Sequence, residues 1–471
     1  MNIIDLSAIE MARLIAHKEI SPVDVVSAHL DRIDQLNGKL NMFVSVFRNE
    51  ALQEAKSAED RLMGGESLGP LHGVPIALKD LTPTRGRRTT FGSQLFKDHI
   101  ATHEPTIVKR IKHSGAIIVG KTNTPEFGHK GTTDNEIVGP TKNPWNPSMT
   151  AGGSSGGSGA AVASKCVPLA EGSDGGGSIR IPASFNGIFG LKPTFGRVPF
   201  DSSPINRFGT TQPYVHFGPL SRRVEDSALL LSILEGYEPN DPYSVPLVKE
   251  NLNEEALKGI KGMTFAYTKN FELYECDSEV SSVIESVLPI LEEYGAKIVE
   301  VPIDFGLDLR ELISFFNRMW YAGLATAYGD LYDRNPASFG SSVATMIDEG
   351  RSISAVELRR TEELRTVIWN KLQHIYSEYD ALLSPVLGVT AFPYDIEGPD
   401  RINGKDAAPI SDWMMTQLYN CTGHPAASIP AGFSGGLPVG LQASASKFND
   451  SILLRIANVI ETANGTSSPS L

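Results

Sequence analysis

The chain has 471 residues, of which 41% are apolar and 21% charged, as is ordinary for a globular protein. With 55 acidic and 42 basic residues the net charge is −13, which argues against nucleic acid or an anionic membrane as the main partner. The three cysteines, Cys166, Cys276 and Cys421, are far apart and match no zinc or disulfide pattern. We therefore expect a protein of a reducing compartment.

The beginning of the chain predicts a helical cover over 1–65. Ser7 and Glu10 have the spacing of a capping box, and Ser21-Pro22 combines an N-cap with a proline at the first helical position. A third helix is predicted over 48–63. The N-terminus has no signal-peptide pattern, and no apolar run is long enough to span a bilayer. These features predict a cytoplasmic protein.

The segment 69–80 changes to a period of two. Val74, Ile76 and Leu78 alternate, so Lys79 at the end of this strand lies on the opposite face. A single lysine at the end of a strand most often reaches out to water. The residues of this strand alone leave open whether Lys79 does so.

Helices and strands then follow in an order typical of α/β proteins. Helices are predicted at 104–114, 159–164, 224–236, 277–294, 353–379 and 449–463. Strands are predicted at 116–119, 166–170, 263–267, 297–302, 380–387 and twice within 420–442. No fixed-period repeat and no long linker is visible. We expect a single α/β domain over 1–471, with a central mixed, largely parallel, twisted β-sheet covered by helices on both faces.

The stretch 151–193 is the most unusual part of the chain. It contains two turns rich in glycine and serine, 152–159 and 172–178. So much glycine is entropically costly to fold and indicates a close approach of the backbone to a phosphate, an oxyanion or another backbone. Neither a dinucleotide fingerprint nor a P-loop pattern fits these turns, which disfavours a nucleotide site.

Ser155 satisfies the G-x-S-x-G pattern of an α/β-hydrolase elbow. In a run this rich in glycine and serine the match carries little information. The pattern would also need a downstream histidine, and none of the candidates, His216, His374 and His424, has a context that recommends it.

A third interpretation uses both turns together with Lys79. The motifs are GVPIALKD at 73–80, TKNPWNP at 141–147, GGSSGGS at 152–158, GSDGGGSIRIPA at 172–183, GLKPTFGRV at 190–198 and NCTGHPA…GLPVGLQ at 420–442. On these motifs the chain resembles the amidase signature family over nearly its whole length. The resemblance implies the amidase-signature fold, with a catalytic core at 66–235 and a remainder at 236–471 that completes the sheet and supplies pocket helices. It also implies an amidohydrolase acting on linear amides, without metal or cofactor.

The resemblance assigns a catalytic triad to three positions. Ser178 is the nucleophile, Ser154 is the bridging serine, in a cis peptide bond with Gly153, and Lys79 is the base. A serine hydroxyl is a weak nucleophile until a base takes its proton, and a lysine can be that base only when it is neutral. Burial favours the neutral form by lowering the pKa of a lysine.

An oxyanion hole is expected from the backbone N–H groups of Gly175, Gly176, Gly177 and Ser178. The family usually has threonine where this chain has Gly175, and we expect a more flexible loop from that difference. Four further residues match the family pattern and are expected to support the loops by hydrogen bonds and ion pairing: Ser155, Ser173, Asp174 and Arg180.

The substrate pocket is predicted from the family position of one loop and from aromatic residues. The loop residues expected to line the acyl side are Gly128, His129, Lys130 and Gly131. Trp320, in the aromatic segment 306–350, and Trp413 are expected to form the far wall, although an aromatic stripe at helical spacing is equally typical of a core. A small-molecule amide is the expected partner, and the family suggests a homodimer.

Two alternatives stay open. Glutamine-hydrolysing subunits of tRNA-dependent amidotransferases share the motifs but carry an acidic residue at the position of Trp413. An indole cannot pair with the ammonium group of glutamine, so Trp413 favours a stand-alone amidase for an apolar or aryl amide, with aliphatic amides, anilides, cyclic amides and carbamates all possible substrates. The alternative from another class is a non-catalytic nucleotide-binding protein.

Overall fold

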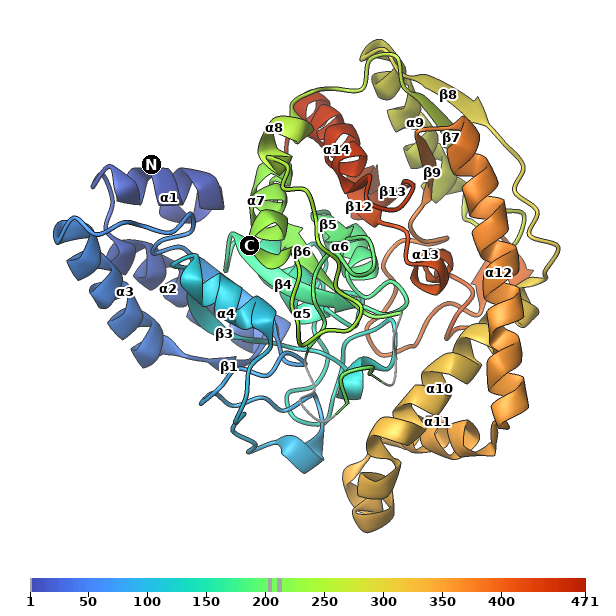
Figure 1. The fold of residues 1–471 in the computed structure, drawn as a ribbon, viewed down its shortest axis with the longest axis horizontal. Coiled ribbons are helices and arrows are strands. Elements are labelled where there is room, and N and C mark those ends of the chain that lie inside the picture. Colours follow the sequence, from blue (N-terminus) through green and yellow to red (C-terminus); the bar gives the residue numbers. More distant parts are fainter. Residues whose placement is uncertain (1, 202–205, 210–213) are drawn as a thin grey trace.

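The computed structural model describes residues 2–201, 206–209 and 214–471, and an 11-stranded sheet runs through the described part (Figure 1). From edge to edge its order is β1 (Phe43–Val46), β3 (Ile117–Thr122), β2 (Pro75–Lys79), β4 (Leu169–Asp174), β6 (His216–Ser221), β5 (Phe189–Lys192), β12 (Ala426–Ser434), β13 (Leu437–Ser444), β9 (Ala381–Pro385), β7 (Thr264–Tyr267) and β8 (Lys297–Glu300). A small separate sheet pairs β10 (Arg401–Ile402) with β11 (Lys405–Asp406).

The helices fill the predicted positions and include others outside the predicted ranges, both short ones and the 26-residue α10. They are α1 (Ala8–Ala16), α2 (Pro22–Leu40), α3 (Arg48–Met63), α4 (Thr106–His113), α5 (Gly156–Ala163), α6 (Arg180–Asn186), α7 (Val224–Leu234), α8 (Leu252–Ala256), α9 (Ser278–Glu293), α10 (Leu309–Arg334), α11 (Ser341–Ser352), α12 (Ala355–Glu378), α13 (Gln417–Thr422) and α14 (Asp450–Asn464). In Figure 1 the blue α1–α3 and the gold and orange α10–α12 lie on opposite sides of the molecule.

The predicted mixed α/β sheet is confirmed, but the expectation that it is largely parallel is wrong. Only the groups β3–β2–β4 and β9–β7–β8 pair in parallel. All pairings from β4 through β6, β5, β12 and β13 to β9 are antiparallel, as is β1 with β3. A parallel pair needs a long crossover, whereas β12 and β13 are joined directly by the turn at Gly435-Gly436.

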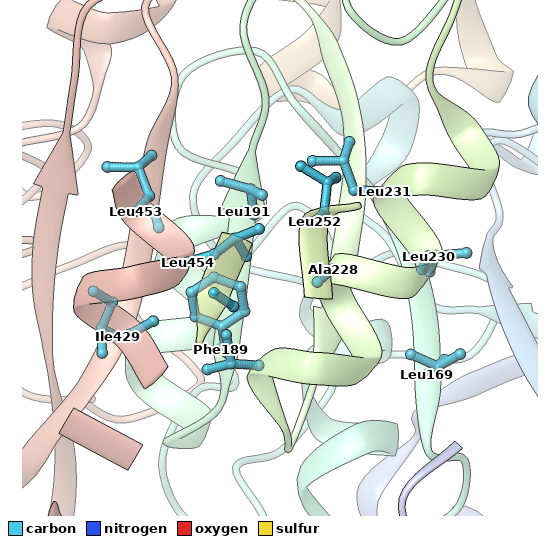
Figure 2. Close-up of a cluster of buried hydrophobic side chains, with 14 of the residues drawn as sticks. Leu169, Phe189, Leu191, Ala228, Leu230, Leu231, Leu252, Ile429, Leu453 and Leu454 are labelled. Carbon is cyan, nitrogen blue, oxygen red and sulfur yellow. The ribbon is translucent and has the colours of Figure 1, made fainter. Parts of the chain in front are cut away.

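One face of the sheet is covered by α7, α8 and α14. Figure 2 shows Leu454 of α14 beside Phe189 and Leu191 of β5, and the leucines of α7 belong to the same cluster. Ile76 and Leu78 of β2 belong to the same cluster, which confirms the predicted alternation of that strand. Burying such a layer of leucines is the main source of stability at this face.

The other face carries α2, α3 and α5. Ala77 of β2 packs there with the alanines of α5, which are small enough for that helix to lie close to the sheet. Because residues two apart in a strand share a face, Lys79 is directed to the α5 side as well. The sheet therefore brings the end of β2 to the Gly/Ser turn that precedes α5.

The helical cover predicted over 1–65 is confirmed for α1–α3, including the Ser7–Glu10 capping box. The prediction missed β1, which pairs with β3 and forms the edge of the sheet. Its short run of apolar residues between two helices gave no alternation to recognise. None of the helices in the described part of the chain has both the length and the apolar character needed to cross a membrane.

Candidate active site

Lys79 is fully buried at the carboxyl end of β2. Its Nζ donates to Ser154 Oγ at 2.7 Å, to Ser173 Oγ at 3.1 Å and to Ser173 O at 3.3 Å. Its backbone N–H donates to Glu171 Oε2 at 2.9 Å, which fixes the end of the strand. A lysine that reaches out to water is therefore excluded here, and Lys79 is instead the point where both Gly/Ser turns meet.

The surroundings of Lys79 favour its neutral form. Burial lowers the pKa of Lys79 to about 7, although the nearby carboxylates of Glu171 and Asp174 act in the opposite direction. At neutral pH a large fraction of the molecules thus carries an uncharged amine at this position. An uncharged amine within hydrogen-bond distance of a serine hydroxyl is able to accept its proton.

The first Gly/Ser turn holds Ser154 against Lys79. The peptide bond between Gly153 and Ser154 is cis, as the family resemblance implies, and Ser154 is buried. A Cβ on Gly153 would lie 2.3 Å from Thr132 O, and one on Gly157 would lie 2.3 Å from Asn123 N. The glycines of this turn are therefore required by the close approach of another backbone segment.

The second turn carries Ser178, which is half-buried and lines a pocket. Ser155 N–H donates to Ser178 O at 3.1 Å, which ties the two turns together. Ser155 Oγ also donates to Ser173 O at 3.2 Å. Among the described residues the hydroxyl of Ser178 has no hydrogen-bond partner, so it is free to meet a substrate.

The predicted oxyanion hole needs one correction. Gly177 N–H donates to Asp174 Oδ1 at 2.7 Å, so this group is already engaged and not available to a substrate. Within the described part of the chain, the N–H groups of Gly175, Gly176 and Ser178 have no acceptor. Three of the four predicted donors thus remain open.

Gly175 itself lies against a tryptophan. A Cβ at this position would be 2.8 Å from the ring of Trp320 and 3.3 Å from Val215. A side chain at this position would collide with the Trp320 ring, so the glycine leaves room for that ring.

Asp174 and Arg180 form a buried ion pair beneath the second turn, with Nε and Oδ2 3.0 Å apart. Arg180 also donates to Thr416 O, Gln442 Oε1 and Asn420 Oδ1. Burial alone would raise the pKa of Asp174, but the Arg180 guanidinium outweighs it and lowers that pKa. Both residues lie under the loop and not on the pocket surface, as expected of supporting residues.

The pocket above Ser178 is mostly apolar. Its lining residues are Gly128, His129, Lys130, Gly131, Gly176, Ser178, Ile181, Ile313, Phe316, Asn317, Trp320, Tyr321, Met346, Ile410, Ser411, Met414 and Gln417. The predicted loop 128–131 and Trp320 are all present. Phe316 and Tyr321 belong to the same predicted aromatic segment, whereas Ile313 and Asn317 of α10 were not predicted, although their spacing of three and four residues along one helix could have found them.

Trp413 does not line the pocket, contrary to the prediction. Its side chain is 1% exposed, stacks on Phe185 at 5.8 Å and donates from Nε1 to Pro409 O. It lies behind Gly131, where a Cβ would be 2.9 Å from its ring. The neighbouring Met414 takes the place on the pocket surface that Trp413 was expected to have.

The charges at the pocket are balanced. Lys130 Nζ pairs with Asp134 at 2.6 Å and with Glu397 at 2.7 Å. Burial lowers the pKa of His129 to about 4, so this ring is neutral near pH 7. Its Nδ1 donates to Glu126 O at 2.7 Å, while its Nε2 has no partner among the described residues.

Two buried titratable residues lie close to Lys79 but were not among the predicted site residues. Lys121 and Asp80 are fully buried close to Lys79, where burial lowers the pKa of Lys121 to about 8 and raises the pKa of Asp80 to about 6. Over residues 2–201, 206–209 and 214–471, no three histidine, cysteine or acidic side chains come together as metal ligands. Of the three candidate histidines of a hydrolase elbow, His216 lies beneath the second turn, where its Nδ1 contacts Tyr214 O at 2.8 Å and Asp174 O at 3.3 Å.

Comparisons with known proteins agree with this geometry. The family model for Amidase matches residues 24–454. The chain is 37% identical over 455 residues to an acylamidase of Rhodococcus erythropolis, covering 96% of this chain and 94% of that protein. It is 34% identical over 485 residues to a glutamyl-tRNA(Gln) amidotransferase subunit of Carboxydothermus hydrogenoformans, covering 98% of both chains.

A solved structure of a bacterial aryl acylamidase of the amidase signature family matches with a TM-score of 0.93 and 33% identity, over 98% of this chain and 96% of that one. The fold expected from the motifs is thereby confirmed. The chain belongs to the amidase signature family and is an amidase, an enzyme that hydrolyses amides.

Proposed function

We propose that this amidase cleaves neutral, apolar amides, with aryl amides such as anilides as its main substrates, through a Ser178–Ser154–Lys79 triad. The observation that carries the proposal is the 2.7 Å contact between a buried lysine amine and the Ser154 hydroxyl, beneath a pocket whose surface includes Ser178. The resemblance to an acylamidase and to an aryl acylamidase supports the same substrate class.

In the first half of the reaction Ser178 Oγ bonds to the amide carbonyl carbon. Its proton passes to Ser154, whose own proton passes to the neutral Lys79 amine. The negative charge on the carbonyl oxygen is stabilised by the open N–H groups of Gly175, Gly176 and Ser178, where each donor is worth roughly 10²–10³ in rate. The C–N bond then breaks, and the leaving nitrogen receives the proton held by Lys79 through Ser154.

In the second half a water molecule attacks the acyl-enzyme ester. Its proton passes along the same two residues to Lys79, and a C–O bond forms to the acyl carbon. The ester bond to Ser178 breaks as this serine recovers its proton. The products are a carboxylic acid and an amine, and the enzyme returns to its starting state.

The lining of the pocket supports a neutral substrate. Within the described residues the lining includes no acidic side chain, and Lys130 is already paired with two carboxylates. An ammonium group such as that of glutamine would find no counter-ion there. This argues against the glutamine-hydrolysing alternative, although an amidotransferase subunit is among the relatives of the chain.

The test has two parts. A fluorophosphonate probe should label the wild-type enzyme and fail to label Ser178→Ala. The purified chain alone should release amine from acetanilide and propionanilide faster than it releases ammonia from glutamine. Equal labelling of Ser178→Ala would refute the nucleophile, and activity with glutamine only would reverse the choice of substrate.

A further inference from the structure

Gln417 is a buried polar residue on the pocket surface. It begins α13, is 2% exposed, and lines the same pocket as Ser178 and Gly176. The preceding residue, Thr416, donates from Oγ1 to Gly176 O. Gln417 therefore adjoins the loop that carries Ser178, and at a largely buried side chain a hydrogen bond to a ligand is stronger than in water.

The two ends of the Gln417 amide have different surroundings. Its Oε1 accepts a hydrogen bond from the Tyr274 hydroxyl at 3.4 Å. The Nε2 group has no acceptor among the described residues, and it is the end of the amide left for the pocket. A substrate that supplies an acceptor at this point gains a hydrogen bond, whereas a substrate that covers the donor with hydrocarbon leaves it unpaired.

A second donor of the same pocket is also unpaired. Trp320 Nε1 is buried and has no hydrogen-bond partner within the described part of the chain. Trp320 and Gln417 come from different elements, α10 and α13, and both contribute to the pocket lining. The apolar wall thus contains donors that an entirely hydrocarbon substrate would leave unsatisfied.

We propose that Gln417 is a specificity-determining residue that donates its amide N–H to an oxygen atom of the substrate other than the scissile carbonyl. The substrate class is then an apolar amide that bears an additional ether or carbonyl oxygen close to the bond that is cut. This inference rests on the proposed amidase function. A pocket that hydrogen-bonds part of its substrate rejects the analogue that lacks the bonding atom, because its own donor is then left unpaired.

The experiment uses pairs of anilides of nearly equal size. On the acyl side the pair is methoxyacetanilide and butyranilide, and on the amine side it is 4-methoxyacetanilide and 4-ethylacetanilide. For the wild-type enzyme we expect kcat/KM to favour the ether in at least one pair by roughly tenfold, the worth of one hydrogen bond. In Gln417→Met, which keeps the length of the side chain, that ratio should fall to about one.

The ratio within a pair is the readout because a general loss of activity cancels in it. Gln373→Met is the matched control, since Gln373 lies on α12 and bonds to His424 away from the pocket. This variant should keep the wild-type ratio. Tyr274→Phe, which frees the Gln417 amide to rotate, should lower the ratio in part and provides a second test if Gln417→Met does not fold.

The outcomes separate the inference from the function on which it rests. If neither member of either pair is hydrolysed, the proposed amidase function for aryl amides fails. If all four anilides are hydrolysed and both ratios are near one, the function stands and the inference is overturned. A preference for the ether that survives in Gln417→Met would also overturn it.

Discussion

The floor and the outer wall of the pocket are built in opposite ways. The floor consists of the end of β2 and the two Gly/Ser turns, is almost wholly buried, and has no spare space, since a Cβ on Gly153 would lie 2.3 Å from Thr132 O. The wall, formed mainly by α10, has half-buried aromatic rings such as Phe316 and Tyr321 that make few polar contacts.

Because of this difference, we expect substitutions in the floor to impair the reaction itself and substitutions in the wall to change mainly which substrates are preferred. A side chain in the floor is held by several hydrogen bonds and by backbone contacts, so replacing it disturbs neighbours on different elements. A side chain in the wall can change size with little effect on the floor. A change in the wall can therefore alter the substrate while the fold is kept, which agrees with the fold likeness of this chain both to an aryl acylamidase and to an amidotransferase subunit.

The largest expected effect comes from the floor. Lys79→Ala removes the proposed proton acceptor for Ser154, and we expect kcat/KM for acetanilide to fall by roughly 10²–10⁴-fold, the usual contribution of a general base. Steady-state kinetics and circular dichroism together measure activity and fold. Lys192→Met is the control, because Lys192 is equally buried but bonds to His424 O outside the pocket. Near-normal activity of Lys79→Ala would contradict its role as base.

The second largest effect is expected on protein stability, when the buried ion pair beneath the floor is broken. Asp174→Ala leaves the buried Arg180 without its carboxylate, and breaking a buried pair in this way costs about 3–5 kcal/mol of stability. Scanning calorimetry should show a much lower Tm than for the wild type. In the control, Asp31→Ala, the exposed pair with Arg48 is lost and the expected change is below about 1 kcal/mol. Equal Tm values for the two variants would be inconsistent with a supporting role of Asp174.

The same division decides how much the sequence alone could predict. The floor is made of short motifs, so the resemblance to the amidase signature family could propose Lys79, Ser154 and Ser178, and the alternation of β2 placed Lys79 on the α5 side of the sheet. The engagement of Gly177 N–H by Asp174 could not be predicted, because it depends on the detailed path of the turn.

The wall depends on contacts between distant segments. Trp413 was placed on the pocket surface by its sequence position, but its ring packs behind Gly131, and Met414 faces the pocket instead. Gln417 was not recognised because a single glutamine has no pattern that distinguishes it. The antiparallel centre of the sheet was missed for a similar reason, since strand order is set by tertiary contacts that single strands do not encode.

The pH dependence tests the floor at a finer level. Because the pKa of Lys79 is lowered to about 7 and the amine acts when it is neutral, kcat/KM should fall about tenfold per pH unit below pH 7 and be level above it. Burial lowers the pKa of His129 to about 4, so this ring stays neutral over the range, whereas Asp80 and Lys121, with pKa values of about 6 and about 8, titrate within it. Acetanilide, which does not titrate between pH 5 and 9, is the appropriate substrate. An activity that still rises steeply at pH 9 would show that Lys79 keeps an ordinary pKa.

The smallest expected effect is a change in substrate preference when an aromatic residue of the wall is replaced. In Trp320→Leu an aromatic surface is lost from the pocket, and we expect the ratio of kcat/KM for propionanilide to that for propionamide to fall by roughly tenfold, since an aromatic contact is worth about 0.5–1.5 kcal/mol. Fluorophosphonate labelling of Ser178 should persist, because the triad is not touched. Trp369→Leu, on α12 against His424, is the matched control and should keep the wild-type ratio. If Trp320→Leu abolished labelling as well, the Trp320 ring would be holding Gly175 in place, and the wall would have to be counted as part of the floor.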